Sequence, residues 1–280
     1  MKKKPDPRTK TNLKKNCKTM FIFVICDPQN GTCHIHAGEI CKVLGAKSLT
    51  VDELEKVEES IIIVLGGDGF LLRVLHKTIG LGNKIFGMNY GTFGFLLNKR
   101  FAAEHLIEAI ETSQEAIIYP LKAIGTTTTG EEFCLYAINE ISMLRETIQA
   151  ANVKVSVLGK SRIERLVCDG LVVSTPAGST AYNFSVHGPI FDYKTNLISL
   201  QPISPFRPRH WRGALLQDSC NIDIEILETN KRPVSISADF VFKQSLQKVT
   251  IFMDKSKPLS LLFEQSSPLS EKIIQEQFAV

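Results

Sequence analysis

A glycine-rich loop with one carboxylate, Gly66-Gly67-Asp68-Gly69, directly follows the apolar run 61–65. Such a run is typical of a central parallel strand, and residues 70–79 have the apolar spacing of a helix. Backbone amides at a strand-to-helix turn favour a bound phosphate group. A carboxylate would repel that anion, but it is useful if Asp68 orients a hydroxyl group and accepts its proton during phosphoryl transfer. The alternative is a tight turn in which Asp68 caps the helix.

A second strand with a glycine-rich loop is predicted over residues 84–96. Its glycines allow the backbone to approach a ligand closely. We expect the two aromatic residues of the loop, Phe93 and Phe95, to pack in the core.

Two polar residues, Asn139-Glu140, interrupt an apolar strand. Neighbouring side chains on a strand point to opposite faces, so both reach one ligand only at a bulge or a strand end. The pair is suited to ribose hydroxyls or an adenine edge. Capping of a turn is an equally simple interpretation.

A third segment, 169–185, begins with Asp169-Gly170 and an apolar strand, and continues with small hydroxyl residues, glycine and Tyr182. These side chains favour hydrogen bonds to sugar and amide groups.

The elements that must position these residues fall into two domains. Residues 20–119 alternate short apolar runs with helical patterns, which predicts a doubly wound α/β domain. Residues 120–263 show recurring short strands and predict an all-β dinucleotide-binding domain. Residues 264–280 have helical spacing, and we expect this C-terminal helix to return to the first domain.

The composition indicates a folded, soluble protein: 280 residues, 44% hydrophobic and 22% charged. No apolar run approaches the roughly 20 residues of a membrane span. Seven cysteines without a Cys-x-x-Cys pair indicate neither a disulfide framework nor a zinc ribbon, and fit the cytoplasm. Residues 1–19 are predicted to be a disordered basic arm, without the interleaved aromatic residues of a nucleic-acid-binding surface.

Other motifs are incomplete. The glycines at 125 and 130 have P-loop spacing, but glutamates follow them, and Gly80-Leu81-Gly82 follows a helix and lacks a third glycine. An ordinary dinucleotide-dependent dehydrogenase is therefore disfavoured. The cysteines and histidines within 26–41 match no compact zinc pattern, and we expect buried or surface thiols there.

Taken together, the three motifs resemble those of the NAD kinase family, over roughly residues 61–260. The stretch 203–212 is similar to the alphaproteobacterial branch. The resemblance implies transfer of the terminal phosphoryl group of ATP to the 2′-hydroxyl of the adenosine ribose of NAD, giving NADP and ADP. It also implies a phosphofructokinase-like first domain, a divalent metal ion (Mg or Mn), an active site between the domains, and a homodimer or homotetramer that binds neither nucleic acid nor a membrane.

The resemblance also implies residue roles. Asp68 would be the catalytic base in the phosphate loop formed by Gly66, Gly67, Asp68 and Gly69, and Arg73 would contact phosphate. Asn139 and Glu140 would bind the adenosine part of NAD, and Asp169 the nicotinamide end. The other NAD-binding residues would be Ala177, Thr180, Ala181, Tyr182, Asn183, Phe184, Ser185 and Asp239, with Asp68, Gly69 and Arg73 from the first domain.

The sequence departs from the family pattern at two places. Many relatives have an arginine two residues before the Asp-Gly pair, where Val167 stands here, so that contact is absent or comes from another residue. Many also have a glutamine two residues after Asp239, where this chain has Val241. The alternative functions are a lipid or sugar kinase with the same Gly-Gly-Asp-Gly loop, and a dinucleotide-binding regulator without catalysis.

Overall fold

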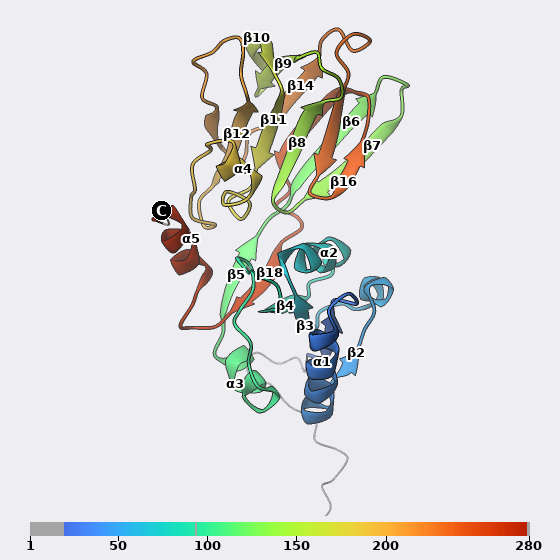
Figure 1. Cartoon of the computed structure of the whole chain (residues 1–280), viewed down its shortest axis with the longest axis vertical. Coiled ribbons are helices and arrows are strands. Elements are labelled where there is room, and N and C mark those ends of the chain that lie inside the picture. The colour runs from blue at the N-terminus through green and yellow to red at the C-terminus, as the bar shows by residue number, and fades with distance from the viewer. Residues whose placement is uncertain (1–19, 93, 279–280) are drawn as a thin grey trace, which may run out of the picture. The chain divides into compact units, whose positions relative to one another are not determined.

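The computed structural model describes residues 20–92 and 94–278 (Figure 1). The predicted basic arm 1–19 and Phe93 lie outside these residues. The chain divides into two units. Unit 1 contains the described residues up to Ala116 together with Ser260–Pro268, and unit 2 contains Ile117–Leu259 and the residues from Leu269 onward. No helix in the described parts of the chain is long and apolar enough to cross a membrane.

Unit 1 is built on a six-stranded sheet in the order β2-β1-β3-β4-β18-β5. The pairs from β2 across to β18 are parallel. The strands are β1 (Ile22–Cys26), β2 (Lys47–Ser48), β3 (Ile61–Gly66), β4 (Lys84–Asn89), β5 (Gln114–Ile118) and β18 (Leu259–Phe263). The helices are α1 (Gly31–Leu44), α2 (Asp68–Thr78) and α3 (Leu106–Glu111), with 3₁₀ turns at Val51–Lys56 and Ala103–His105.

The central strand β3 is buried along its whole length. Its β-branched and apolar side chains suit a parallel strand that is covered on both faces. At its carboxyl end the chain enters α2 through Gly67, without an intervening loop. The sequence therefore places Asp68 at the edge of the sheet, where ligands of open α/β sheets bind.

Unit 2 consists of two six-stranded sheets that pack around one apolar core (Figure 1). Their orders are β10-β9-β14-β17-β6-β7 and β13-β12-β11-β8-β15-β16, and each neighbouring pair is antiparallel. The first sheet contains β6 (Leu121–Thr127), β7 (Glu132–Ala137), β9 (Ala151–Val157), β10 (Lys160–Cys168), β14 (Ile222–Ile226) and β17 (Leu246–Met253). The second contains β8 (Glu140–Arg145), β11 (Gly170–Ser174), β12 (Leu197–Ile203), β13 (Ala214–Gln217), β15 (Val234–Ala238) and β16 (Val241–Lys243). The short helix α4 (Tyr182–Ser185) and helix α5 (Leu269–Gln277) complete the unit.

The predicted combination of an α/β domain and an all-β domain is confirmed, but the C-terminal helix was predicted in the wrong unit. Helix α5 belongs to unit 2, where the Gln277 side chain donates a hydrogen bond of 2.8 Å to the carbonyl of Ile190. The element that returns to the α/β sheet is strand β18, which pairs with β4. Strand pairing satisfies the backbone groups along that side of β4, which a helix cannot do.

Asn98 joins the returning segment to the glycine-rich part of unit 1. This buried side chain donates hydrogen bonds to the carbonyls of Gly87 (3.0 Å) and Leu262 (2.8 Å), and accepts one from the N–H of Glu264 (2.8 Å). Both segments would lose buried hydrogen-bond partners without it.

We therefore expect Asn98→Ala to lower the free energy of unfolding by about 2 kcal/mol, because buried polar groups lose their partners. Chemical denaturation would measure the change. Lys99→Ala is the matched control, since the exposed Lys99 side chain makes an ion pair with Glu264 and should contribute less than about 1 kcal/mol. Equal effects of the two substitutions would contradict this role of Asn98.

Candidate active site

The phosphate loop is a direct turn from β3 into α2. Gly67 is the N-cap residue and its carbonyl accepts hydrogen bonds from the N–H groups of Phe70 and Leu71, both at 3.0 Å. A Cβ atom on Gly66 would lie 2.7 Å from the Phe70 ring, so this turn requires glycine there. Asp68 is the first residue of the helix, and the alternative in which it is the N-cap is wrong.

The Asp68 carboxylate holds the second glycine-rich loop. It accepts hydrogen bonds from the backbone N–H groups of Phe95 (2.7 Å) and Leu96 (3.1 Å). The Tyr90 N–H donates to the Gly66 carbonyl at 2.8 Å, so the two loops run side by side. Phe95 was predicted to pack in the core, but it is half-buried. The buried residues of this loop are Leu96 and Leu97.

Arg73 lies on the exposed surface of α2, one helical turn beyond Gly69. Residues four apart share a helix face, so its guanidinium group is on the side of the loop glycine.

Tyr90 secures the start of the second loop, a role that its place in the sequence does not indicate. Its carbonyl accepts a hydrogen bond of 3.1 Å from Asn30, the N-cap of α1, and its hydroxyl is hydrogen-bonded to His36. The Arg100 guanidinium lies 4.3 Å from the centre of its ring and also donates to the carbonyl of Asn89. Burial raises the pKa of Tyr90 to about 12 although Arg100 opposes this, so the phenol keeps its proton.

The described cysteines and histidines near α1 are placed as individual side chains. Within the described ranges, no group of three or more His, Cys, Asp or Glu side chains is arranged to hold a metal ion. The Cys26 thiol is hydrogen-bonded to His34 at 3.2 Å, and burial raises the pKa of Cys33 to about 11. The expectation of ordinary thiols fits both observations.

In unit 2, Asn139 and Glu140 occupy a tight junction between β7 and β8. The Asp239 carboxylate accepts hydrogen bonds from the N–H groups of Ile138 (2.7 Å), Asn139 (3.0 Å) and Glu140 (3.2 Å). Asp239 itself has a φ of 50°, a left-handed conformation that is unusual for a residue other than glycine. The junction is thus capped by Asp239, and the Glu140 side chain is available for another role.

Glu140 is a buried carboxyl group beside a second carboxylate. Burial, followed by the charge of Asp239, raises its pKa to about 7, although the backbone N–H of Tyr182 opposes the shift. Within the described residues its Oε2 atom is buried and has no hydrogen-bond partner. A buried carboxyl oxygen without a hydrogen bond has an unfavourable free energy, so a ligand hydroxyl is a suitable partner for Oε2.

The segment after β11 folds back against Asn139. The Asn139 carbonyl accepts the N–H of Thr175 at 2.9 Å, and a Cβ atom on Gly178 would lie 2.2 Å from the same oxygen. Only glycine allows this approach, which brings the predicted dinucleotide wall next to Asn139 and Glu140.

The predicted wall residues divide into inward and outward groups. Ala177 and Asn183 are buried, and the Asn183 amide donates to the carbonyls of Ser179 (3.1 Å) and Pro189 (2.9 Å), which gives it a structural role. The half-buried or exposed members are Thr180, Ala181, Tyr182, Phe184 and Ser185.

Asp169 is not brought together with Glu140. It precedes β11, and that strand pairs with β8 so that Ser174 lies opposite Glu140 and Gly170 opposite Leu144. The two carboxyl groups are therefore at opposite ends of the strand pair, about 17 Å apart for five residues of extended chain. Asp169 instead pairs with Arg145, whose Nε lies 2.6 Å from Oδ1.

Comparison with known proteins agrees with these motifs. The family model of the ATP-NAD kinase C-terminal domain matches residues 138–261. The NAD kinase of Hyphomonas neptunium is 47% identical over 222 residues, which cover 79% of this chain and 87% of the relative. The NAD kinase of Rhizobium meliloti is 45% identical, over 78% of this chain and 85% of the relative.

The chain belongs to the NAD kinase family. The family resemblance is thereby confirmed, and a lipid or sugar kinase or a non-catalytic regulator is not favoured.

Two solved structures have the same fold. The yeast NADH kinase complexed with NADH has a TM-score of 0.78 at 17% identity, covering 92% of this chain and 86% of its own. The NAD kinase from Archaeoglobus fulgidus in complex with ATP has a TM-score of 0.75 at 23% identity, covering 93% and 100%.

The raised pKa of Glu140 predicts a pH-dependent stability. An unfolded glutamate has a pKa of about 4.5, so between pH 4.5 and about 7 the folded chain holds a proton that the unfolded chain has lost. The stability from this group is complete below pH 4.5 and is lost as the pH rises through about 7. Relative to Glu140→Gln, the nucleotide-free wild type should lose on the order of 1 to 3 kcal/mol of unfolding free energy across this window.

Urea denaturation of both proteins from about pH 4.5 to pH 8 would measure the difference. Parallel pH profiles of the two proteins would show that Glu140 has the same pKa in the folded and the unfolded chain and would contradict the prediction.

Proposed function

We propose that this member of the NAD kinase family transfers the terminal phosphoryl group of ATP to the 2′-hydroxyl of the adenosine ribose of NAD, giving NADP and ADP. The observation that carries the proposal is the position of the Asp68 carboxylate. Two backbone N–H groups hold it at the turn from β3 into α2, where we propose that phosphate binds. We propose roles for Arg73, Asn139 and Glu140 in the same reaction.

The phosphate loop supplies orientation and charge stabilisation. The N–H groups at the start of α2 and the positive end of its dipole favour the phosphoryl oxygens, and Arg73 adds a cation one turn further on. Asp68 accepts the proton of the attacking hydroxyl as the oxygen–phosphorus bond forms. Its two hydrogen bonds from the second loop fix its direction, which is the positional requirement on a general base.

Glu140 and Asn139 bind the adenosine part of NAD. The buried Oε2 atom of Glu140 is an acceptor for a ribose hydroxyl, and the half-buried Tyr182, whose N–H contacts Glu140, lines the same place. Asp239 acts indirectly, because its carboxylate is occupied by the three N–H groups of the junction.

A divalent ion, Mg²⁺ or Mn²⁺, is proposed to enter as the complex with ATP. Mg²⁺ in such enzymes is commonly held by one or two carboxylates together with the substrate phosphates. Asp68 is a carboxylate at the phosphate loop and fits this mode. When bound, the ion would neutralise charge on the phosphates. We further propose a cytoplasmic homodimer or homotetramer, as the family resemblance implies.

The first test is to incubate the protein with ATP, Mg²⁺ and NAD and to measure NADP. Asp68→Asn should then lower kcat by about 10² to 10⁴, the usual contribution of a positioned base, while folding and NAD binding persist. Thermal melting and calorimetric titration with NAD are the controls. Near-normal turnover of the variant would reduce Asp68 to a support for the second loop.

Glu140→Gln should lower kcat/KM for NAD by about tenfold or more and leave KM for ATP nearly unchanged, because a hydrogen bond to a charged group contributes about 1.5 to 3 kcal/mol. Glu132→Gln, which removes an exposed glutamate from β7, is the matched control. If NAD kinetics are unaffected by Glu140→Gln, Glu140 does not contact this substrate.

A further inference from the structure

A small groove in unit 1 lies between helix α1 and the two ends of the second glycine-rich loop. Its volume is about 360 Å³, near the lower end of the range of small-molecule sites, which is roughly 300–1,000 Å³. The residues that define this α1 groove here are Ile35, His36, Glu39, Tyr90, Arg100 and Phe101. None of them belongs to the proposed catalytic or NAD-binding residues.

One wall of the groove is a single face of α1. Ile35, His36 and Glu39 lie three or four residues apart, which puts them on the same side of the helix. Ile35 is 72% exposed, and the half-buried Phe101 is part of the same groove. These two side chains give the groove an apolar part.

The floor of the groove is polar and well held. The buried Tyr90 side chain is hydrogen-bonded through its hydroxyl to His36. The Arg100 guanidinium lies 4.3 Å from the centre of the Tyr90 ring, and its Nε donates to the Asn89 carbonyl at 2.9 Å. In the described chain this bond uses only one of the five N–H donors of Arg100, so the terminal nitrogens are able to bind an anion.

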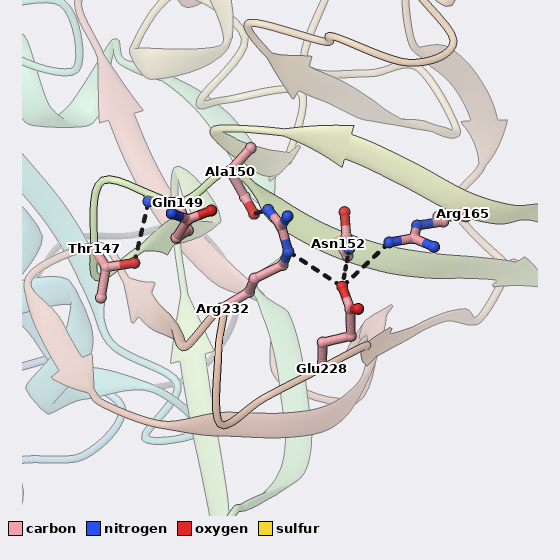
Figure 2. Close-up of polar contacts among 7 residues, drawn as sticks. All are labelled: Thr147, Gln149, Ala150, Asn152, Arg165, Glu228 and Arg232. Carbon is pink, nitrogen blue, oxygen red and sulfur yellow. Dashed lines mark hydrogen bonds and ion pairs between the residues drawn. The ribbon is translucent and has the colours of Figure 1, made fainter.

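Two opposite charges, Glu39 and Arg100, line this groove without pairing. Both side chains are exposed, and among the described residues they form no ion pair with each other. Opposite charges in unit 2 behave differently, because Glu228 binds Arg165 and Arg232 at once (Figure 2). The α1 groove therefore presents an acceptor and a donor of opposite charge, separated by a space.

Both charges lie close to the Tyr90 hydroxyl. Burial is the main cause of the raised pKa of Tyr90, but the charge of Arg100 lowers this pKa and the charge of Glu39 raises it. A small ligand that rests on Tyr90 would thus experience both charges.

The charges restrict the chemistry of that ligand. A simple anion would be attracted by Arg100 and repelled by Glu39, and a simple cation would experience the reverse. A small molecule with one carboxylate and one ammonium group satisfies both side chains. The apolar part formed by Ile35 and Phe101 favours a ligand that also has an apolar side chain.

We propose that the α1 groove binds a free α-amino acid with an apolar side chain. Arg100 binds its carboxylate, Glu39 binds its ammonium group, and Ile35 and Phe101 contact its side chain. Because the amino acid is small and the groove is open, the two charged contacts decide which ligands are accepted.

Isothermal titration calorimetry of the full-length protein without nucleotides tests the proposal. The probes are L-phenylalanine and L-leucine, each with the two analogues that lack one charge: 3-phenylpropionate and phenethylamine, or 4-methylpentanoate and 3-methylbutylamine. At least one amino acid should bind one-to-one with a Kd of about 1 mM or tighter, the affinity expected of so small a ligand. Its analogues should bind at least about fivefold more weakly, because each leaves one charge of the groove without a partner.

Two variants without charge assign the contacts. Glu39→Gln should weaken amino-acid binding by about three- to fivefold and remove the preference over the carboxylate-only analogue. Arg100→Gln should weaken binding similarly and remove the preference over the amine-only analogue. Lys99→Gln and Glu104→Gln are the matched controls, since both side chains are exposed and outside the groove lining, and should leave the affinity unchanged.

Three results would overturn the proposal. The first is that neither amino acid binds at concentrations up to about 10 mM. The second is an analogue that binds the wild type as tightly as its parent amino acid. The third is an unchanged affinity in Glu39→Gln or in Arg100→Gln, which would place the amino acid elsewhere. Glu39 lies on the exposed face of α1, so Glu39→Gln keeps the test decisive if Arg100→Gln does not fold. The result is independent of the proposed function, because no measurement uses ATP or NAD.

Discussion

In each unit, one carboxylate accepts hydrogen bonds from consecutive backbone N–H groups and holds that unit's candidate site residues in place. Asp68 binds the N–H groups of Phe95 and Leu96, and Asp239 binds those of the 138–140 junction. Charge-assisted bonds of this kind are roughly twice as strong as neutral ones and hold irregular backbone where no strand or helix can. Both glycine-rich loops of unit 1 and the Asn139-Glu140 pair of unit 2 depend on them.

The use of Asp239 in this way has an electrostatic consequence for Glu140. Burial is the larger cause of the rise in the pKa of Glu140 to about 7, and the nearby charge of Asp239 adds to it. Near neutral pH the empty site therefore contains a mixture of neutral and ionised Glu140. In the proposed function, a ribose hydroxyl that donates to Oε2 would favour the ionised form and would couple dinucleotide binding to release of a proton.

Much of the fold follows from local sequence. The β-branched run of β3 and the glycines after it predict the strand, the turn and the helix that place Asp68, because all three are contiguous.

The role of Asp239 was not predictable, since its partners are about a hundred residues away and its strained φ has no signal in the sequence. Helix α5 was predicted correctly as an element but placed in the wrong unit, because an apolar stripe specifies burial and not the surface that buries it. Tyr90 was missed for a similar reason, as Asn30, His36 and Arg100 converge on it only in the folded unit.

The position of a charge in space matters more to a ligand than its position in the sequence. Val167 and Arg145 are on different strands, yet each is close to Asp169, one two residues before it along the chain and the other directly across the ladder. An antiparallel sheet offers several positions from which a long side chain reaches the same point, since cross-strand neighbours are as close as residues two apart on one strand. A cation on β8 can therefore reach Asp169 as readily as one on β10. The sequence shows that residue 167 is not a cation, but only the strand register shows that Arg145 lies across from Asp169 and pairs with it.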